Sequence, residues 1–378
     1  MENRDYRYEN VFAQASFQFC GHIDEYLIAN TRHLALFYCQ PRFGEHHHVL
    51  RRYEEGRLVD ERVIRSSQGL FAYYWLWLWH HNVELWRFTR HRREATLLLC
   101  GHPVCLFGSA LMRLFRRVRY AYAIGDYFPS KKLAIRAFER VKKFYHCLFY
   151  HDRADFAYYL TDAINRRMNG GIVRTDAAHR TVMWGMKPFS DCMKHRSASR
   201  RILFVGLVRP GQGVGEMLDF LSMRIDFWLA LVGGAANGYG TTVERMIAER
   251  GLGSRVYFEN RFHSERELRD IAKTCFCGLA LYDTAPDNFT HYADPGKVKA
   301  YAELGLPIVM TRISDIVPFI ERFHAGEIVD SSVDAGAAVE KIAADPQGYM
   351  QGIEAFNAHF DYRTYYPKAY LEWEGLWR

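Results

Sequence analysis

The second half of the chain alternates short apolar segments with amphipathic ones, and this alternation limits the possible folds more than any other feature. Segments 201–206 (RILFVG), 227–234 (FWLALVGG) and 277–283 (CGLALYD) are apolar on both faces, as is typical of buried parallel strands. The intervening segments have helical spacing, with Ser264 as a predicted N-cap and Gly305 as a predicted helix end. The pattern predicts a parallel sheet covered by helices on both faces.

The first half is less regular but follows the same alternation. Segments 33–41, 94–103, 119–129 and 144–152 are predicted strands separated by helical stretches. A chain of 378 residues also exceeds one ordinary core. We therefore predict an α/β protein with two doubly wound, Rossmann-like domains that face a central cleft, where the carboxyl ends of parallel strands bind ligands.

Charge is divided unevenly between the two halves. Residues 1–200 hold 32 Lys and Arg against 19 Asp and Glu, a net charge of +13, whereas the remainder holds 18 against 24, or −6. The asymmetry indicates that the first half meets an anionic partner, such as lipid head groups, a lipid diphosphate or nucleic acid. A basic surface kept for solubility is the alternative.

The eight cysteines follow no regular framework, which favours a reducing cytosol. CGHPVC at 100–105 has no second ligand pair at zinc spacing, so no metal site is predicted, and the histidines at 46–48 are interpreted as a solvated loop. The first residues lack a signal-peptide pattern, and no apolar run is long enough to span a membrane. We expect a cytoplasmic protein.

Two glycine-containing motifs have the composition of a phosphate site. Segment 206–213 (GLVRPGQG) joins a predicted strand to a predicted helix, and its glycines allow an anion to approach backbone N–H groups. Segment 294–311 (DPGKVKAYAELGLPIVMT) opens a helix with Pro295 and Lys297. Glycines after a strand are often only turn residues, but both motifs in this order are more specific than either alone.

These segments resemble the donor-binding domain of GT-B-fold glycosyltransferases, particularly the retaining family 4 (glycosyltransferase group 1) type. Residues 202–220 resemble its opening strand, phosphate loop and first helix, 255–275 its base-contacting strand and loop, and 294–311 its donor-phosphate and ribose motif. In the first half only YAIGDYFP, residues 122–129, resembles a strand of the acceptor domain.

The resemblance implies the roles of the domains. Residues 1–190 would bind the acceptor, 191–200 form a linker, 201–360 bind the nucleotide-sugar donor, and 361–378 form a helix that crosses back to the first domain. The implied reaction transfers a sugar from a nucleotide-sugar donor to a lipid-linked or cell-envelope saccharide acceptor with retention. It implies no cofactor, since the nucleotide sugar is itself a substrate.

The chain departs from the family pattern at four positions. The family has an Arg after the first glycine of the loop and a Lys before the second, where this chain has Leu207 and Gln212. A ribose-holding Glu would fall at Ala300 and a sugar-facing Glu near Tyr292. Ribose recognition by a carboxylate at position 300 is therefore excluded, so another residue holds the ribose or the donor differs.

Candidate site residues follow from residue type and from the resemblance. Asp126 after a predicted strand and His22 in FCGHIDEY are the candidate catalytic residues, although turn or capping roles would also explain them. In the retaining reaction that the resemblance implies, the leaving phosphate would take the acceptor proton, so catalysis would depend on positioning and on neutralising the diphosphate. The candidate donor-binding residues are Gly206, Arg209, Gly213, Arg261, Asp283, Asp294 and Lys297.

Segment 71–93 combines Trp and Tyr with a basic end and predicts an interfacial helix, with an aromatic core helix as the alternative. Segments 111–123 and 130–146 place more cationic residues beside apolar ones. Peripheral contact with the inner face of an anionic membrane is therefore predicted.

Two other functions stay open. A GT-B-fold sugar-nucleotide epimerase would need a carboxylate cluster in the cleft. A non-catalytic nucleotide-sugar or glycan-binding protein would explain the missing charged contacts. Nucleic-acid binding is disfavoured, because no recognisable reading motif accompanies the basic segments.

Overall fold

The chain forms two compact units in the computed structural model, an N-terminal unit of residues 1–185 with 362–378 and a C-terminal unit of residues 186–361. The predicted linker begins inside helix α6 (Ser190–Lys194), whose Asp191 pairs with Arg269 at 2.6 Å, so this helix belongs to the C-terminal unit. The structure describes residues 6–15, 21–39, 47–67, 69–101, 112–125, 127, 129, 136–137, 140, 154–194, 200–236 and 238–376.

The C-terminal unit is built on a six-stranded sheet in the order β11-β10-β9-β12-β13-β14, and every neighbouring pair is parallel. The predicted parallel sheet is therefore confirmed. The order reverses between β9 and β12, and the loops that follow such neighbouring strands diverge and leave room for a ligand. The strands are β9 (Arg201–Val205), β10 (Trp228–Val232), β11 (Val256–Glu259), β12 (Cys277–Ala280), β13 (Ile308–Thr311) and β14 (Gly326–Val329).

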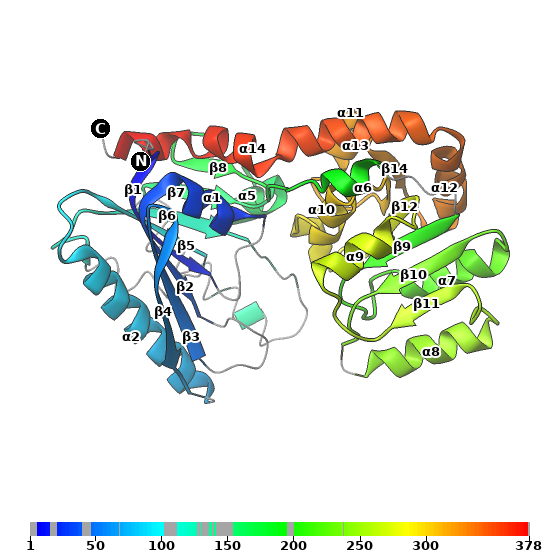
Figure 1. Ribbon diagram of the computed structural model, residues 1–378, viewed down its shortest axis with the longest axis horizontal. Helices are drawn as coiled ribbons and strands as arrows, with labels where there is room; N and C mark the ends of the chain where they lie inside the picture. Colours follow the sequence, from blue (N-terminus) through cyan, green and yellow to red (C-terminus); the bar gives the residue numbers. More distant parts are fainter. Residues whose placement is uncertain are drawn as a thin grey trace. The chain divides into compact units, whose positions relative to one another are not determined.

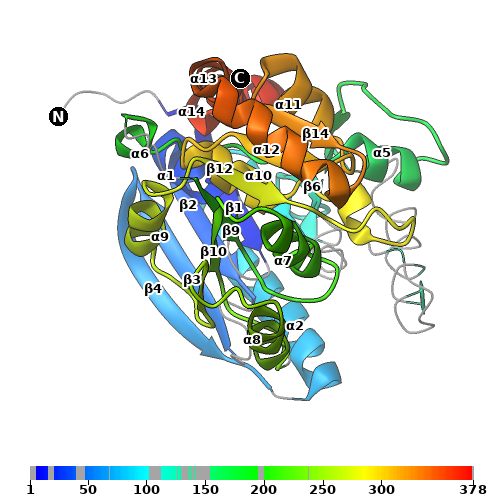
Figure 2. The same ribbon diagram turned by 90° about the vertical axis from the view of Figure 1, so that its right-hand side faces the viewer.

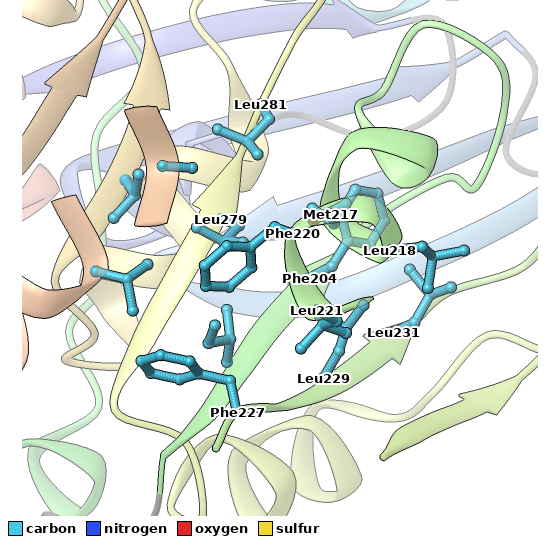
Figure 3. Packing of buried hydrophobic residues seen from close by; sticks show 14 of the residues in the cluster. Phe204, Met217, Leu218, Phe220, Leu221, Phe227, Leu229, Leu231, Leu279 and Leu281 are labelled. Carbon is cyan, nitrogen blue, oxygen red and sulfur yellow. The ribbon is translucent and has the colours of Figure 1, made fainter. Parts of the chain in front are cut away.

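Helices α7 and α8 lie next to each other on one face of this sheet (Figure 2). Phe204 and Leu229 of the sheet meet Met217 and Leu221 of α7 in a fully buried core (Figure 3), each contributing about 1.5–3 kcal/mol on burial. Ser264 forms the predicted cap, since its hydroxyl accepts from the N–H of Glu267. The helices are α7 (Val214–Met223), α8 (Tyr239–Glu249), α9 (Glu265–Ala272), η2 (Phe289–Tyr292), α10 (Gly296–Glu303), α11 (Val317–Phe323), η3 (Ser332–Asp334), α12 (Ala335–Ala344) and α13 (Pro346–Phe360).

The N-terminal unit contains an eight-stranded sheet in the order β4-β3-β2-β1-β5-β6-β7-β8 (Figure 1). It is parallel from β2 to β8, and β3 and β4 extend one edge as an antiparallel hairpin. The strands are β1 (Tyr8–Ala15), β2 (Thr31–Tyr38), β3 (His47–Glu54), β4 (Arg57–Arg65), β5 (Thr96–Cys100), β6 (Val118–Ile124), β7 (Phe156–Tyr159) and β8 (His179–Thr181). The helices are α1 (Ile23–Asn30), α2 (Leu70–Thr89), α5 (Asp162–Met168), α14 (Tyr362–Ala369) and η4 (Leu371–Leu376).

Three of the predicted N-terminal strands correspond to β2, β5 and β6, whereas segment 144–152 lies outside the described residues. The interpretation of the histidines as a solvated loop was wrong. His46 is not described, but His48 lies inside strand β3, fully buried, with its Nδ1 2.6 Å from the carbonyl oxygen of Cys39. Burial lowers the pKa of His48 to about 4, so it is a neutral core residue at physiological pH.

Within the described ranges, no helix is both long and apolar enough to cross a membrane. In the same ranges, no group of three or more His, Cys, Asp or Glu side chains is placed to hold a metal ion. Of the CGHPVC motif, Cys100 is buried in β5, and residues 102–105 lie outside the described part of the chain.

Candidate functional site

Two loops run side by side where β9 and β10 reach the carboxyl edge of the C-terminal sheet. The N–H of Val208 donates to the carbonyl oxygen of Gly234 at 3.0 Å. The N–H of Ala236 in turn donates to the carbonyl oxygen of Val208 at 2.9 Å. A Cβ on Gly233 would lie 1.9 Å from the carbonyl oxygen of Gly206, and both glycines have positive φ angles. Only glycine allows this contact, so backbone packing fixes the shape of the loop after β9.

Gly213 closes the same loop and directly precedes helix α7. Its φ is 75°, and a Cβ there would lie 1.8 Å from the carbonyl oxygen of Leu281. The loop therefore rests on the backbone that follows β12. The first N–H groups of α7 have no partners within the helix, and a helix start favours negative charge.

Lys297 reaches this loop from the first turn of α10. Its Nζ lies 3.2 Å from Oε1 of Gln212 and 3.7 Å from the ring centre of Phe204. The ring centre of Tyr282 lies 4.9 Å from the same atom. A Cβ on Gly206 would come within 3.4 Å of the Lys297 Cε, so the lysine stem covers the first glycine of the loop.

A second cation, Arg209, lies in the same loop with its guanidinium 5.0 Å from the ring centre of Phe289. Across the residues that the structure describes, neither Arg209 nor Lys297 forms an ion pair with a carboxylate. Burial and, to a smaller extent, the charge of Arg209 hold the pKa of Lys297 well below its ordinary value. Two basic side chains that lack a carboxylate partner in the described ranges, beside a glycine loop, give this site a clear preference for an anion.

Tyr301 anchors the helix that carries Lys297. Its hydroxyl donates to the carbonyl oxygen of Leu279 at 2.6 Å and accepts from the N–H of Val205 at 3.3 Å. A Cβ on Gly278 would lie 2.4 Å from the tyrosine ring, so this glycine makes room for it. These bonds tie α10 to β9 and β12 and thereby fix the base of Lys297, one turn before Tyr301.

Asp294, a predicted donor contact, has a partner inside the protein. Its Oδ2 lies 3.3 Å from Nζ of Lys299, and both side chains are buried. The same Nζ lies 3.7 Å from the ring centre of Phe360. Burial lowers the pKa of Lys299, and Asp294 opposes that shift, so the pair stabilises the start of α10.

The other predicted donor residues flank the glycine loop. Arg261, in the loop after β11, is exposed and pairs with Glu259 at 2.7 Å and Glu267 at 2.8 Å. Asp283, after β12, accepts from the N–H of Ala285 at 2.9 Å, which is a turn contact. The structure thus brings Gly206, Arg209, Gly213 and Lys297 together and places Arg261 and Asp283 on neighbouring loops of the same edge.

Of the two candidate catalytic residues, His22 lies in the N-terminal unit and Asp126 lies outside the described residues. His22 directly precedes α1 with a left-handed backbone, φ 58°. Its Nδ1 is 3.1 Å from Oε1 of Glu25, and its ring stacks on Tyr362 with 5.5 Å between ring centres. These contacts hold the imidazole in one orientation.

Sequence reasoning missed the polar and aromatic surroundings of Lys297. In the sequence Gln212 stands out only as a departure from the family pattern, yet its buried side-chain amide contacts the lysine. In the sequence, Phe204 and Tyr282 look like ordinary residues of predicted strands. No signal in the sequence distinguishes them, because their role depends on α10 packing across two strands.

The two parallel-sheet units have the GT-B fold of glycosyltransferases, as comparison with solved structures shows. No protein-family model and no curated protein sequence matches the chain. Sucrose-phosphate synthase from Thermosynechococcus elongatus matches with a TM-score of 0.69 and 14% identity, over 97% of this chain and 99% of that one.

Two further structures match over nearly their whole length. Anabaena HepE in complex with UDP-glucose has a TM-score of 0.63 and 14% identity, over 97% of this chain and 99% of HepE. The UDP-forming α,α-trehalose-phosphate synthase from Burkholderia vietnamiensis has a TM-score of 0.66 and 11% identity, over 99% of this chain and 100% of that one. At these identities the likeness establishes the fold.

Proposed function

We propose that the chain is a retaining glycosyltransferase that transfers a sugar from a UDP-sugar donor to a lipid-linked or cell-envelope saccharide acceptor. The observation that carries the proposal is the pair of basic side chains, Lys297 and Arg209, which lie beside the glycine loop and have no carboxylate partner among the described residues. HepE was solved with UDP-glucose and the trehalose-phosphate synthase is a UDP-forming enzyme, and both similarities support a uridine diphosphate as the anion.

The chemistry follows from the charge that develops on the leaving group. Lys297, Arg209 and the first N–H groups of α7 would neutralise the departing diphosphate, and each charge-assisted hydrogen bond contributes about 1.5–3 kcal/mol. The leaving phosphate would itself take the acceptor proton. Asp126 and His22 are proposed to position the acceptor hydroxyl, and Arg261 and Asp283 to border the base and the sugar.

Incubation with a panel of nucleotide sugars and a lipid-linked saccharide tests the proposal. We expect calorimetric binding of a UDP-sugar and, by mass spectrometry, an extended acceptor. Neither binding nor hydrolysis of any donor would overturn the proposal. Release of a free epimerised sugar would point to an epimerase, and binding without turnover that is unchanged in Asp126→Ala would point to a binding protein.

Donor binding is expected to be coupled to proton uptake by Lys297. A diphosphate beside Nζ raises the lowered pKa of this amine, so at a pH between the two pKa values the complex binds this proton more fully than the separate molecules do. Affinity should therefore fall as pH rises between the two pKa values, by at most about tenfold per pH unit. Calorimetry with UDP-glucose in buffers of different ionisation enthalpy measures the uptake. Heats that do not depend on the buffer would contradict it.

Peripheral membrane association is part of the proposal, and helix α2 supports it. Trp75, Trp79 and Trp86 are 68%, 60% and 45% exposed and fall within an arc of about 40° on the helix. His81 and Leu85 are fully buried on the opposite side. An exposed tryptophan stripe opposite the buried side has no role in the core, and indole rings favour the head-group region of a bilayer.

Changing Trp75 and Trp79 together to Ser is expected to weaken binding to phospholipid vesicles by about tenfold or more, because two large apolar surfaces no longer insert. Vesicle sedimentation measures the effect. Trp228→Ser, an exposed tryptophan of the C-terminal unit, is the matched control and should bind as the original protein does. Equal losses in both variants would contradict a specific role for α2.

A further inference from the structure

A second cationic site lies at the amino edge of the N-terminal sheet, whereas the glycine loop belongs to the C-terminal unit. Residues 94–95 directly precede β5 and residues 116–117 directly precede β6, and these two strands run parallel. A pocket of ≈ 540 Å³ opens between these segments. The residues that define its chemistry are Glu94, Arg113, Arg116, Arg117, Arg119 and Leu376.

The arginines of this pocket outnumber their acidic neighbours. Arg113 and Arg119 share the carboxylate of Asp155, at 3.1 and 2.9 Å. Arg116 and Arg117 are exposed, and neither has a carboxylate partner among the described residues. Among the described residues, four arginines against Asp155 and Glu94 leave a local charge of +2 (4 − 2), so the pocket attracts an anion.

Backbone hydrogen bonds hold residues 112–117 in place while side chains of this segment face solvent. The N–H of Arg116 donates to the carbonyl oxygen of Met112 at 2.8 Å. The N–H of Thr96 donates to the carbonyl oxygen of Arg117, also at 2.8 Å. Between Arg113 and Arg116, the side chains of Leu114 and Phe115 are 74% and 73% exposed. Two adjacent apolar side chains are thus presented to water within a cluster of arginines, an arrangement that a soluble core does not require.

We propose that residues 113–119, called the arginine turn, bind the phosphate of an anionic lipid in a bilayer while Leu114 and Phe115 enter the acyl layer. Arg116 and Arg117 would contact the lipid phosphate, and the pocket would receive the head group. The inference rests on the proposed membrane association and names its lipid class, but it does not depend on sugar transfer.

A bilayer fits this surface better than a soluble phosphate ester or a nucleic acid. A soluble ester needs only the arginines and leaves the exposed Leu114 and Phe115 unexplained. Single-stranded nucleic acid is bound by several aromatic platforms along a groove, whereas the arginine turn has one exposed aromatic side chain. Charge and apolar exposure together match an anionic membrane surface.

Sedimentation of the full chain with vesicles tests the inference. We expect binding to phosphatidylcholine vesicles that contain phosphatidylglycerol and weak binding to phosphatidylcholine alone. Arg116→Gln with Arg117→Gln should weaken binding to the anionic vesicles by roughly thirtyfold, since each arginine near a charged surface contributes about a factor of five. Leu114→Ser with Phe115→Ser should weaken binding to a similar degree while leaving its salt dependence unchanged.

Arg266→Gln with Arg322→Gln removes the same charge from exposed positions of the C-terminal unit and should leave vesicle binding unchanged. Thermal unfolding shows whether each variant is folded. The inference would be overturned if both arginine-turn variants bound anionic vesicles as tightly as the original protein. It would also be overturned if the control variant lost as much vesicle affinity as they do. Competition by glycerol phosphate alone, or retention on an oligonucleotide without vesicle binding, would also overturn it.

The same proteins are titrated with UDP-glucose to separate the two proposals. Nucleotide-sugar binding that survives while vesicle binding is absent would overturn only the membrane inference. Vesicle binding that depends on the arginine turn, without binding of any nucleotide sugar, would overturn only the donor site.

Discussion

Replacing Lys297 with Met is expected to weaken UDP-sugar binding by about tenfold to a hundredfold, as loss of one charge-assisted hydrogen bond predicts. The fold should survive, because methionine suits the apolar contact with the Phe204 ring. Removal of a partly buried cation that lacks a carboxylate partner in the described structure should even maintain or raise the midpoint of thermal unfolding. Calorimetry and thermal unfolding measure the two effects.

Lys299→Met is the matched control, since it makes the same change two residues further along α10. This variant leaves Asp294 buried without its lysine, so it should lose about 3–5 kcal/mol of unfolding free energy. We therefore expect Lys297→Met to lose donor affinity and Lys299→Met to lose stability. Unchanged donor affinity in Lys297→Met would contradict the assignment of this side chain to the phosphate.

A rescue variant distinguishes a charge effect from a shape effect. Because Oε1 of Gln212 lies 3.2 Å from the Lys297 Nζ, a lysine at position 212 could return a cation to nearly the same place from the loop side. Gln212→Lys added to Lys297→Met should therefore recover part of the lost affinity. If Lys297 had only a structural role, the added lysine would not restore donor affinity.

The alternation of strands and helices was enough to predict the C-terminal sheet, because each of its buried strands is apolar on both faces. Strand β14 (Gly326–Val329) was missed, since only two of its four residues, Ile328 and Val329, are apolar. The hairpin of β3 and β4 was missed for a related reason. Strand β4 is mostly exposed and charged, so it lacks the apolar run that marked the other strands.

The donor site was partly predictable, and the limit is physical. The two glycines and Lys297 stand at fixed offsets from predicted strands and helices, so local sequence reveals them. The contact between Lys297 and Gln212 joins residues 85 positions apart and depends on how α10 is anchored by Tyr301. The partnership of Asp294 with Lys299 was equally hidden, because a carboxylate near a phosphate motif reads as a ligand contact until its burial is known.

Gly213→Ala is expected to destabilise the C-terminal unit by more than about 3 kcal/mol and to abolish donor binding with it. The new Cβ would lie 1.8 Å from the carbonyl oxygen of Leu281, so the loop or the segment after β12 must move. The left-handed backbone at this position adds about 1–2 kcal/mol of strain for any residue other than glycine. Denaturant unfolding, followed by calorimetry with UDP-glucose, measures both losses.

Gly211→Ala separates the clash from the backbone strain. Gly211 belongs to the same loop and has nearly the same φ, 79° against 75°, but a Cβ there would meet nothing within 4 Å. This variant should therefore lose only about 1–2 kcal/mol and still bind the donor. If both alanines cost the same, the close approach of Gly213 to Leu281 does not set the geometry of the phosphate loop. If Gly213→Ala alone collapses binding, the carbonyl of Leu281 is the support on which that loop is built.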